Sequence, residues 1–418
     1  MNKEDSLYSI YVQILKEELV MAMGCTEPIA ISYACAKATQ VLNHLPDRIV
    51  VKASGSIIKN VKSVIVPHTN GLKGIEVAAA AGALYGDANA KLEVLSCATH
   101  EQIEELPEYV KNTNITVQHI EQGHVFDLGI NVYYEQEHAS VRIVDTHTNI
   151  VQIEKDWKVI FEDKTTSLEH KADHSALIMK QIWDFSQTVD IEDVKEILDC
   201  QITCNMAIAN EGIHNSYGAN IGHVILNMDL DCVKTRAKAY AAAGSDARMN
   251  GCELPVVINS GSGNQGITCC VPVVVYAKEL NSSDEKLYRA LVLSNLTAIY
   301  IKTGIGTLSA FCGAVSAGAA AGAGIAYLHD GTYEEIQHTI VNTLAILSGT
   351  ICDGAKIAAS VDAGIMGYYM YKNKQQFYAG DGIVAHSVDE TIQNIGTLGS
   401  QGMLQTNDKI IEMMISCD

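Results

Sequence analysis

The stretch from Thr303 to Ala363 decides the fold, because it joins two glycine-rich segments. It begins Thr303-Gly304-Ile305-Gly306-Thr307, continues through an alanine- and glycine-rich run, and reaches Ser348-Gly349-Thr350-Ile351-Cys352-Asp353-Gly354-Ala355-Lys356. A glycine inside a helix costs about 1 kcal/mol relative to alanine, so this many glycines indicate a close approach to the backbone. Cys312 and Cys352 each lie within two residues of a glycine. The pattern therefore predicts that an inorganic group or a small substrate lies between helices here.

The segment from Thr303 to Leu328 has no charged residue and is long enough to cross a bilayer. Its apolar character comes mainly from alanine and glycine rather than from leucine and isoleucine, and no second segment of this kind accompanies it. A helix that is apolar on all sides also suits the centre of a large helical domain. We therefore expect a buried helix and no membrane partner.

The composition limits the partners that the protein can have. Its 418 residues suffice for two or three domains of about 100–200 residues each. The 49 acidic residues outnumber the 29 lysines and arginines, and the net charge of -20 argues against nucleic acid and anionic membranes. The polar start of the chain lacks an apolar signal core, which predicts a cytoplasmic protein. Its twelve cysteines are then expected to be free, metal-bound or catalytic.

Hydrophobic periodicity divides the chain into three parts. Residues 1–44 read as N-terminal helices that pack with a helical domain, residues 45–162 as a small inserted α+β domain, and residues 163–418 as a large helical catalytic domain. The fold class expected is therefore α+β and mostly helical. In the middle part, helices are predicted at residues 74–84 and 101–111, and strands at residues 48–53, 61–66, 91–95, 115–120, 129–134, 140–145 and 149–154.

The motif Gly24-Cys25-Thr26-Glu27-Pro28 reads as a helix start. Gly24 can end one helix, Thr26 can cap the next, and Pro28 suits a first turn. A cysteine at a helix start lies near the positive end of the helix dipole, which lowers its pKa and favours the thiolate. Cys25 is therefore a candidate reactive group, and the alternative is a small buried residue.

Two polar, glycine-containing segments are candidate ligand-binding loops. In the segment Glu211–Asn220, His214 is either an acid–base group or ligand contact, or a structural histidine. In the segment Asn259–Ile267, successive backbone N–H groups and the helix that follows suit a substrate carboxylate, and the alternative is a flexible linker. Cys269 and Cys270 come next, but adjacent cysteines chelate one metal poorly.

Four motifs spread over nearly the whole chain resemble the L-cysteine desulfidase family, which is related to the alpha chain of iron–sulfur L-serine dehydratases. They are Gly24-Cys25-Thr26-Glu27-Pro28, Ser260-Gly261-Ser262-Gly263-Asn264-Gln265-Gly266, Cys352-Asp353-Gly354-Ala355-Lys356 and Gly380-Asp381-Gly382-Ile383-Val384. The resemblance implies a helical catalytic domain with a smaller α+β domain. It also implies conversion of L-cysteine to pyruvate, ammonia and hydrogen sulfide, while the sequence does not choose between L-cysteine and L-serine as substrate.

The resemblance also implies roles for particular residues. Cys25 would be the base that removes the Cα proton. The loop formed by Ser260, Gly261, Ser262, Gly263, Asn264 and Gln265 would hold the substrate carboxylate. Thr26, Glu27, His214 and Asn215 are further candidates for substrate binding. No lysine motif for pyridoxal phosphate is identifiable, so the chemistry is expected to proceed without it.

The cofactor implied by the resemblance is a 4Fe-4S cluster whose open iron acts as a Lewis acid on the leaving group. Cys312 and Cys352 match the first two cluster ligands of the family, but the third position holds Ala359. Three explanations stay open. Another cysteine supplies the ligand (Cys269, Cys270 or Cys417), the cluster is absent, or a different metal binds the remaining pair.

Three hypotheses about function follow. The first is a lyase that acts on cysteine or serine with iron–sulfur chemistry. The second is a cluster-free family member that binds a small amino acid, or acts in regulation, without β-elimination. The third is a cofactor-independent enzyme that uses Cys25 as its acid–base group. The acidic balance and the small-residue helices are compatible with a homodimer.

Overall fold

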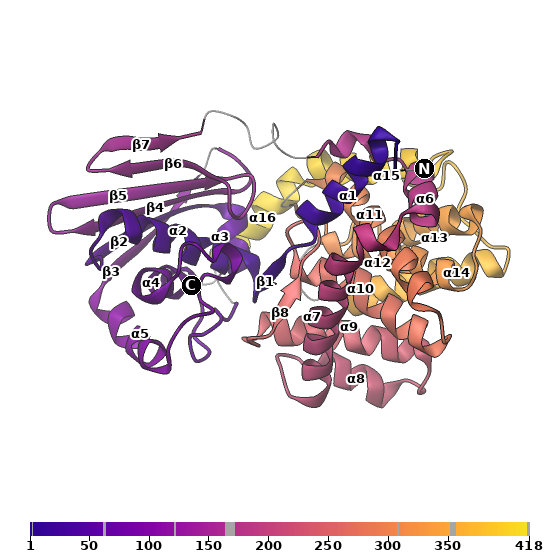
Figure 1. Cartoon of the computed structure of the whole chain (residues 1–418), viewed down its shortest axis with the longest axis horizontal. Helices are drawn as coiled ribbons and strands as arrows, with labels where there is room; N and C mark the ends of the chain where they lie inside the picture. The colour runs from indigo at the N-terminus through magenta and orange to yellow at the C-terminus, as the bar shows by residue number, and fades with distance from the viewer. Residues whose placement is uncertain are drawn as a thin grey trace. The chain divides into compact units, whose positions relative to one another are not determined.

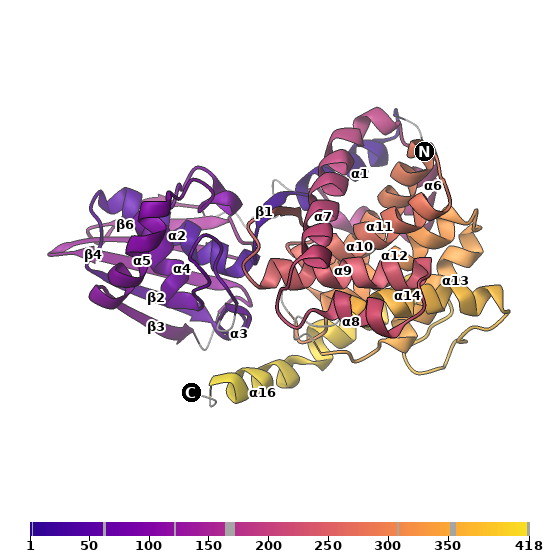
Figure 2. The ribbon, with the colours of Figure 1, turned by 90° about the horizontal axis from the view of Figure 1, so that it is seen from below.

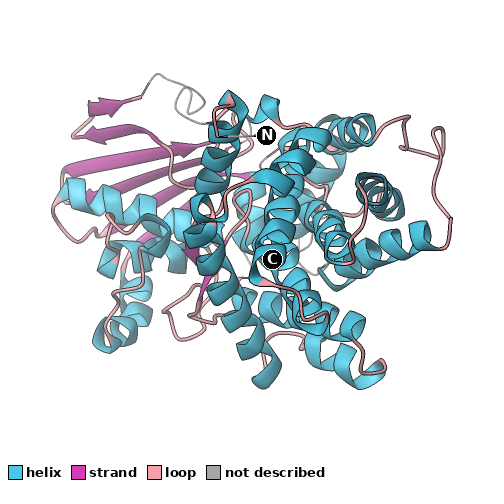
Figure 3. Ribbon diagram, turned by 45° about the vertical axis from the view of Figure 1, so that its right-hand side comes forward, coloured by secondary structure: helices cyan, strands magenta, loops and turns pink. Residues whose placement is uncertain are grey.

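The computed structural model describes residues 1, 3–61, 64–120, 123–163, 172–306, 309–351 and 357–415, with residues 414 and 415 described by their backbone only. Contacts divide the chain into two compact units. We call residues 1–20, 171–247 and 255–405 the helical unit, and residues 21–170, 248–254 and 406–418 the sheet unit. The predicted fold class, mixed α+β and mostly helical, is confirmed, and Figure 3 shows the strands gathered in one part of the chain.

Six strands of the sheet unit form one sheet in the order β3-β2-β4-β5-β6-β7. Strands β2 and β3 run parallel, and the other neighbours run antiparallel. Apolar residues alternate along β2 and meet apolar partners on β4, as in the pair Val51 and Ile130, both buried. The bounds are β2 (Arg48–Ser54), β3 (Asn114–Ile120), β4 (Asp127–Tyr134), β5 (Glu137–Val144), β6 (Ile150–Lys155) and β7 (Lys158–Glu162).

Helices α2 (Thr26–Leu42) and α4 (Ile75–Tyr85) pack on this sheet and on each other (Figures 1 and 2). Ser32 of α2 donates a hydrogen bond to the Ala78 carbonyl over 2.7 Å. A Cβ on Gly82 would lie 2.2 Å from the Ser32 carbonyl oxygen, so only glycine permits this crossing. The other elements of this unit are β1 (Met21–Met23), α3 (Gly55–Val61), η1 (Lys91–Glu93), α5 (His100–Asn112) and most of α16 (Leu404–Ile415).

The helical unit is built around α12 (Gly313–Leu328), which α10, α11, α13 and α14 surround (Figure 1). All residues of α12 except Tyr327 are buried. The elements of this unit are α1 (Ser6–Glu18), η2 (His174–Ala176), α6 (Met179–Thr188), η3 (Ile191–Asp193), α7 (Lys195–His214), α8 (Ile221–Met228), α9 (Val233–Met249), β8 (Pro255–Val257), α10 (Gly263–Glu279), α11 (Asp284–Ile305), α13 (Tyr333–Ile346), α14 (Ile357–Lys372), α15 (Val388–Thr397) and η4 (Leu398–Gly402).

The glycines of α12 allow close contact with α14. A Cβ on Gly318 would lie 2.3 Å from the Ser360 carbonyl oxygen, and one on Gly322 would lie 2.6 Å from the Gly364 carbonyl oxygen. The space beside these glycines therefore holds the α14 backbone rather than a cofactor, which corrects the prediction for this part of the stretch. Within the described ranges, no helix is both long and apolar enough to cross a membrane.

The structure differs from two predicted strands and contains strands that were not predicted, among them β1, β7 and β8. Residues 91–93 form the 3-10 helix η1, and residues 94 and 95 continue as a turn. Buried Leu92 and Val94 produce an alternation that resembles a strand. Residues 61–66 include the end of α3 and a single bridge at Ile65, with 62 and 63 outside the described part. Strand β7 was not predicted, because all of its residues are exposed and its sequence lacks the alternation of a half-buried strand.

The two units also divide the chain differently from the predicted domains. Helix α1 belongs to the helical unit, but α2 packs on β4 and β5 in the sheet unit. The prediction had grouped both helices with the helical domain. Helix α2 is apolar along most of its surface and has Ile29, Ile31 and Leu42 fully buried. Such a surface packs on a sheet as readily as in a helical bundle, and here it contacts β4, β5 and α4.

Candidate functional site

Cys25 stands at the start of α2, as the motif predicts. It is the N-cap residue, with extended backbone and only 4% of its surface exposed, and Thr26 is the first helical residue rather than the cap. Gly24 precedes it with a φ of +59° and follows strand β1 (Met21–Met23), so it does not end a helix as predicted. A Cβ at this glycine would lie 2.2 Å from Cγ of Pro67, so the turn that presents Cys25 requires glycine on both conformational and steric grounds.

The Glu27 carboxylate is the centre of a buried polar cluster in the sheet unit. The Cys25 thiol donates a hydrogen bond to Glu27 Oε2 over 3.1 Å, and the Thr26 hydroxyl donates to the same oxygen over 3.2 Å. The Asn60 amide donates to Oε1 over 2.9 Å. Both carboxylate oxygens therefore have hydrogen-bond donors within the protein, and Glu27 itself is only 9% exposed.

The electrostatics of this cluster place the proton on sulfur. Burial raises the pKa of Glu27, but His147, the Cys25 hydrogen bond, Arg248 and Asn60 together hold that pKa below its ordinary value. Burial raises the pKa of the Cys25 thiol, and the neighbouring Glu27 carboxylate raises it further. The predicted thiolate at Cys25 is therefore wrong, because burial and an adjacent carboxylate outweigh the dipole of α2.

The segment from Asn259 to Ile267 forms a tight turn at the start of α10. Ser260 and Gly261 have φ of +49° and +76°, and Asn259 and Ser262 exchange two backbone hydrogen bonds of 3.1 Å. The Ser262 side chain caps α10 by accepting from the Gln265 N–H over 3.4 Å. The alternative of a flexible linker is therefore excluded for this segment.

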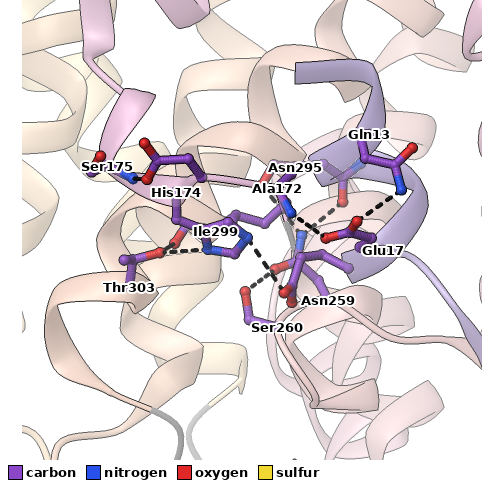
Figure 4. A network of polar contacts seen from close by, with 12 residues as sticks. Gln13, Glu17, Ala172, His174, Ser175, Asn259, Ser260, Asn295, Ile299 and Thr303 are labelled. Atoms are coloured by element: carbon purple, nitrogen blue, oxygen red, sulfur yellow. Dashed lines mark hydrogen bonds and ion pairs between the residues drawn. The ribbon is translucent and has the colours of Figure 1, made fainter. Parts of the chain in front are cut away.

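Fully buried amides hold the turn in place (Figure 4). Asn295 of α11 and Gln201 of α7 exchange side-chain hydrogen bonds of 2.9 and 2.8 Å. Oδ1 of Asn295 also accepts from Asn259 over 3.0 Å, and from the Cys269 thiol over 3.2 Å. Asn205 bonds the backbone of the adjacent strand β8 over 2.8 and 3.0 Å. These residues are not among the predicted site residues, although polar amides on otherwise apolar helices were the available signal.

Gln265 brings the turn next to the predicted ligand Cys312. The Gln265 side chain is 3% exposed and lies against Gly313, where a Cβ would be 2.8 Å from Gln265 Nε2. Cys312 is the N-cap of α12, is 3% exposed, and donates its N–H to the Thr350 carbonyl over 3.0 Å. Gln265 Oε1 is buried and has no hydrogen-bond partner in the described part of the chain.

His214 and Asn215 lie at the end of α7 rather than in a loop, which corrects the prediction for residues 211–214. Both are exposed, and their side chains bond the same helix, His214 to the Asn210 carbonyl over 2.7 Å and Asn215 to Glu211 over 2.8 Å. The glycine at 212 does not break the helix. It lets α7 approach α9, because a Cβ there would be 2.1 Å from the Ala243 carbonyl oxygen. No contact described here joins His214 or Asn215 to the turn at Ser260, so their binding roles stay predictions.

A family model described as serine dehydratase alpha chain matches residues 89–412. The chain belongs to the serine dehydratase alpha-chain family. It is 53% identical over 424 residues to the UPF0597 protein of Desulfitobacterium hafniense, a match that covers 100% of this chain and 99% of the relative. The UPF0597 proteins of Lachnoclostridium phytofermentans and Finegoldia magna are each 48% identical, over 98% and 97% of this chain and 100% and 99% of theirs. Family membership points to a serine dehydratase-like lyase.

The residues described in this member of the serine dehydratase alpha-chain family do not fit a three-thiolate cluster. Ala359 is exposed in the first turn of α14, while Cys352 and Cys417 lie outside the described residues. Cys269 and Cys270 are fully buried, burial raises the pKa of both thiols, and both bond within the protein. Across the described ranges, no group of three or more His, Cys, Asp or Glu side chains could hold a metal ion.

His174 is a further polar residue of the helical unit that was not predicted as part of a site (Figure 4). The Thr303 hydroxyl donates to the Ile299 carbonyl over 2.9 Å, so it accepts from His174 Nδ1, which lies 3.2 Å away. The other ring nitrogen lies 3.6 Å from a Glu18 carboxylate oxygen. In this family member the two contacts of His174 connect the segment that contains η2 to α11 through Thr303 and to α1 through Glu18.

Proposed function

We propose that this chain is a pyridoxal-phosphate-independent lyase that eliminates the β-substituent of a small L-amino acid. The products would be pyruvate, ammonia and hydrogen sulfide from L-cysteine, or pyruvate and ammonia from L-serine. Membership in the serine dehydratase alpha-chain family supports the reaction class. The observation that carries the proposal is the rigid polar turn from Ser260 to Gln265 at the start of α10.

This turn has the properties of a carboxylate site. The first N–H groups of a helix have no acceptor inside the helix, and the helix dipole adds about half a positive charge there. The buried amides of Asn295 and Asn259 fix the turn before any ligand arrives, so binding costs little conformational entropy. The buried Gln265 Oε1 is an acceptor that the substrate ammonium group would satisfy.

The reaction needs a base for the Cα proton and a proton for the leaving group. Removal of the Cα proton supplies the electron pair for a new Cα–Cβ double bond. The Cβ–O or Cβ–S bond breaks, and the leaving group takes up a proton to become water or hydrogen sulfide. The aminoacrylate that remains is hydrolysed to pyruvate and ammonia. We assign the base to Cys25, the residue that the L-cysteine desulfidase resemblance implies.

The resemblance attaches a 4Fe-4S cluster to this chemistry, and a bound cluster would act as a Lewis acid on the leaving group. Cys312 is the one family ligand position with a cysteine in the described residues, and Ala359 cannot supply a thiolate. No step of the proposal therefore passes through the cluster.

The exposed alanine at position 359 favours a second candidate function. A family member that lacks the third thiolate could bind a small amino acid through the Ser260 turn without eliminating its β-substituent. Such a protein would retain the carboxylate site, because that site is made by α10 and the buried amides.

The two candidates are separated by measuring products and binding on the same preparation. The chain is purified without oxygen and incubated with L-serine, L-cysteine and their D-enantiomers, and pyruvate is measured with lactate dehydrogenase. We expect pyruvate from at least one L-enantiomer, and a raised KM in Ser262→Ala because the cap of α10 is lost. Calorimetric binding of an L-amino acid without any pyruvate would reject the lyase in favour of the second candidate.

A further inference from the structure

The contact between Cys25 and Glu27 suits a role for Glu27 other than the predicted substrate binding. We infer that Glu27 relays the proton of Cys25: its carboxylate accepts the thiol proton before the sulfur takes the Cα proton, and then gives it to the leaving group. This inference rests on the proposed function, because it needs a reaction that starts with loss of a Cα proton.

The geometry identifies the oxygen that receives the proton. The thiol points at Glu27 Oε2 over 3.1 Å, while Oε1 is held by the Asn60 amide over 2.9 Å. The Thr26 hydroxyl also donates to Oε2 over 3.2 Å, but Oε2 is the oxygen that the thiol contacts, so the proton would move to it along the existing hydrogen bond. Cys25 and Glu27 are 4% and 9% exposed, so the carboxylate rather than bulk water is the acceptor within reach of the sulfur.

The groups that face Glu27 keep its carboxylate ionised, which leaves it without a proton at rest but makes it a weaker base. On α2 it meets the Cys25 thiol and the Thr26 hydroxyl, and on α3 it meets Asn60. His147, from the turn between β5 and β6, and Arg248 both favour the charged carboxylate, against the effect of burial, and lower its pKa. At rest the carboxylate is therefore ionised and the proton sits on sulfur.

The relay closes as a cycle. The S–H bond of Cys25 breaks and an O–H bond forms at Glu27 Oε2. The thiolate then takes the Cα proton, and the electron pair of that C–H bond forms the Cα–Cβ double bond. The leaving group departs with the electron pair of its bond to Cβ and takes the proton from Glu27. Cys25 ends as a thiol and Glu27 as a carboxylate, which is the state from which they started.

A structural role explains less of this arrangement. An acidic residue in the first turn stabilises a helix through its dipole, and Glu76 of α4 does so from an exposed position. Glu27 occupies the corresponding turn of α2 but is buried and has donors on both oxygens. Burial of a carboxylate costs free energy, and an exposed side chain would give the same dipole interaction.

The test follows the ionisation of Cys25 without relying on turnover. Iodoacetamide labelling is measured peptide by peptide across a pH range in wild type, Glu27→Gln and the matched control Glu76→Gln. The pH midpoint of labelling is compared rather than its rate, because Cys25 is only 4% exposed. Cys232 is the internal reference, because it is exposed and hydrogen bonds from Thr235 lower its pKa. In wild type, Cys25 should react at higher pH than Cys232.

We expect Glu27→Gln to react at Cys25 at lower pH than wild type, because the neighbouring negative charge is gone. Its kcat for pyruvate should nevertheless fall about 100-fold, at the lower end of an acid–base contribution, with KM little changed. Glu76→Gln should change neither quantity. Easier ionisation together with slower turnover is a pattern that loss of a structural residue would not produce.

Circular dichroism checks the fold of each variant, and Glu27→Asp is the second variant should Glu27→Gln unfold. This variant keeps the negative charge but places it farther from the sulfur. Its Cys25 should therefore be labelled at a pH between those of wild type and the glutamine variant. If Cys25 in the variants that fold is labelled at the same pH as in wild type, or at a higher pH, the relay is overturned even where pyruvate forms. Absence of pyruvate from wild type with both amino acids would instead overturn the proposed function.

Discussion

The side chain of Asn295 joins α11 to the turn at the start of α10, because its Oδ1 accepts a hydrogen bond from Asn259 Nδ2 over 3.0 Å. The same oxygen accepts from Gln201 of α7 and from the Cys269 thiol. One buried amide therefore connects three helices to the candidate carboxylate site. A network of this kind stabilises only when each member is satisfied, because a buried group without a partner is costly.

Replacing Asn295 by alanine should destabilise the helical unit and weaken substrate binding. The change leaves Gln201 and Asn259 without their shared partner, and each buried unsatisfied group costs about 1–3 kcal/mol. Urea unfolding should show a loss of about 3 kcal/mol, and KM should rise. The control Asn373→Ala removes an exposed amide that donates to the Tyr369 carbonyl, and it should stay within about 0.5 kcal/mol of wild type. Equal effects of the two changes would contradict the account.

Replacing Gly318 by alanine should lower the melting temperature. The new methyl group would lie 2.3 Å from the Ser360 carbonyl oxygen, so α12 and α14 must separate. Overpacking typically costs about 1–3 kcal/mol, which exceeds the gain of about 1 kcal/mol from a better helix former. In the control Gly129→Ala the methyl group would lie 3.6 Å from Cβ of Lys52 in the sheet, and little change is expected. A rise in melting temperature for Gly318→Ala would show that the two helices do not meet at this residue.

Glu335 should contribute a pH-dependent part of the stability. Burial raises its pKa, but Lys372 and the Thr332 N–H outweigh burial and hold the pKa below the ordinary 4.5. A carboxylate with a lowered folded pKa stabilises above its unfolded pKa, and this stability disappears as the pH falls through the folded value. Glu335→Gln should therefore be less stable than wild type at pH 7, with a difference that shrinks below about pH 4.

The matched control for that experiment is Glu334→Gln. Its side chain is 70% exposed and lies 4.0 Å from His338, and exposed pairs contribute little. Thermal unfolding of the three proteins between pH 7 and pH 3 gives both comparisons. A difference between wild type and Glu335→Gln that is the same at both ends of this range would contradict the assignment.

The amount of iron bound should depend on the residue at position 359. Wild type offers alanine where the family resemblance expects a third thiolate, so anaerobic reconstitution should leave its iron content below four per chain. Ala359→Cys should bind more iron than wild type, and the neighbouring control Ala358→Cys should not. Colorimetric iron analysis decides this, and four irons per chain in wild type would show that another residue completes the ligand set.

Local sequence signals predicted local structure well. Gly24 and Pro28 marked the turn and the helix start at Cys25. The alternation of apolar and polar residues marked β2 and the strands β3, β4, β5 and β6 of the same sheet. These features depend on neighbours in the chain, which a sequence displays directly. The predicted strand at residues 91–95 failed because a turn can bury Leu92 and Val94 as a strand would.

Features that depend on distant residues could not be predicted in the same way. The thiol state of Cys25 follows from burial and from Glu27, whose charge depends on Asn60, His147 and Arg248. The motif around Cys25 contains none of these last three residues. The network at Asn295 likewise joins α7, α10 and α11, and no spacing along the chain reveals that their amides meet. The assignment of α2 to the sheet unit is a third case, because its apolar surface suits a sheet and a helical bundle equally well.

The central claim is that Cys25 takes the Cα proton of a small L-amino acid, and deuterium exchange tests it most directly. L-Serine and L-cysteine are incubated with the chain in deuterium oxide, and the Cα proton signal is followed by proton NMR alongside pyruvate. Wild type should remove the Cα proton of at least one substrate and release pyruvate from it, while Cys25→Ser should do neither. Retention of the Cα proton in both substrates with wild type, or equal rates for wild type and Cys25→Ser, would contradict the account.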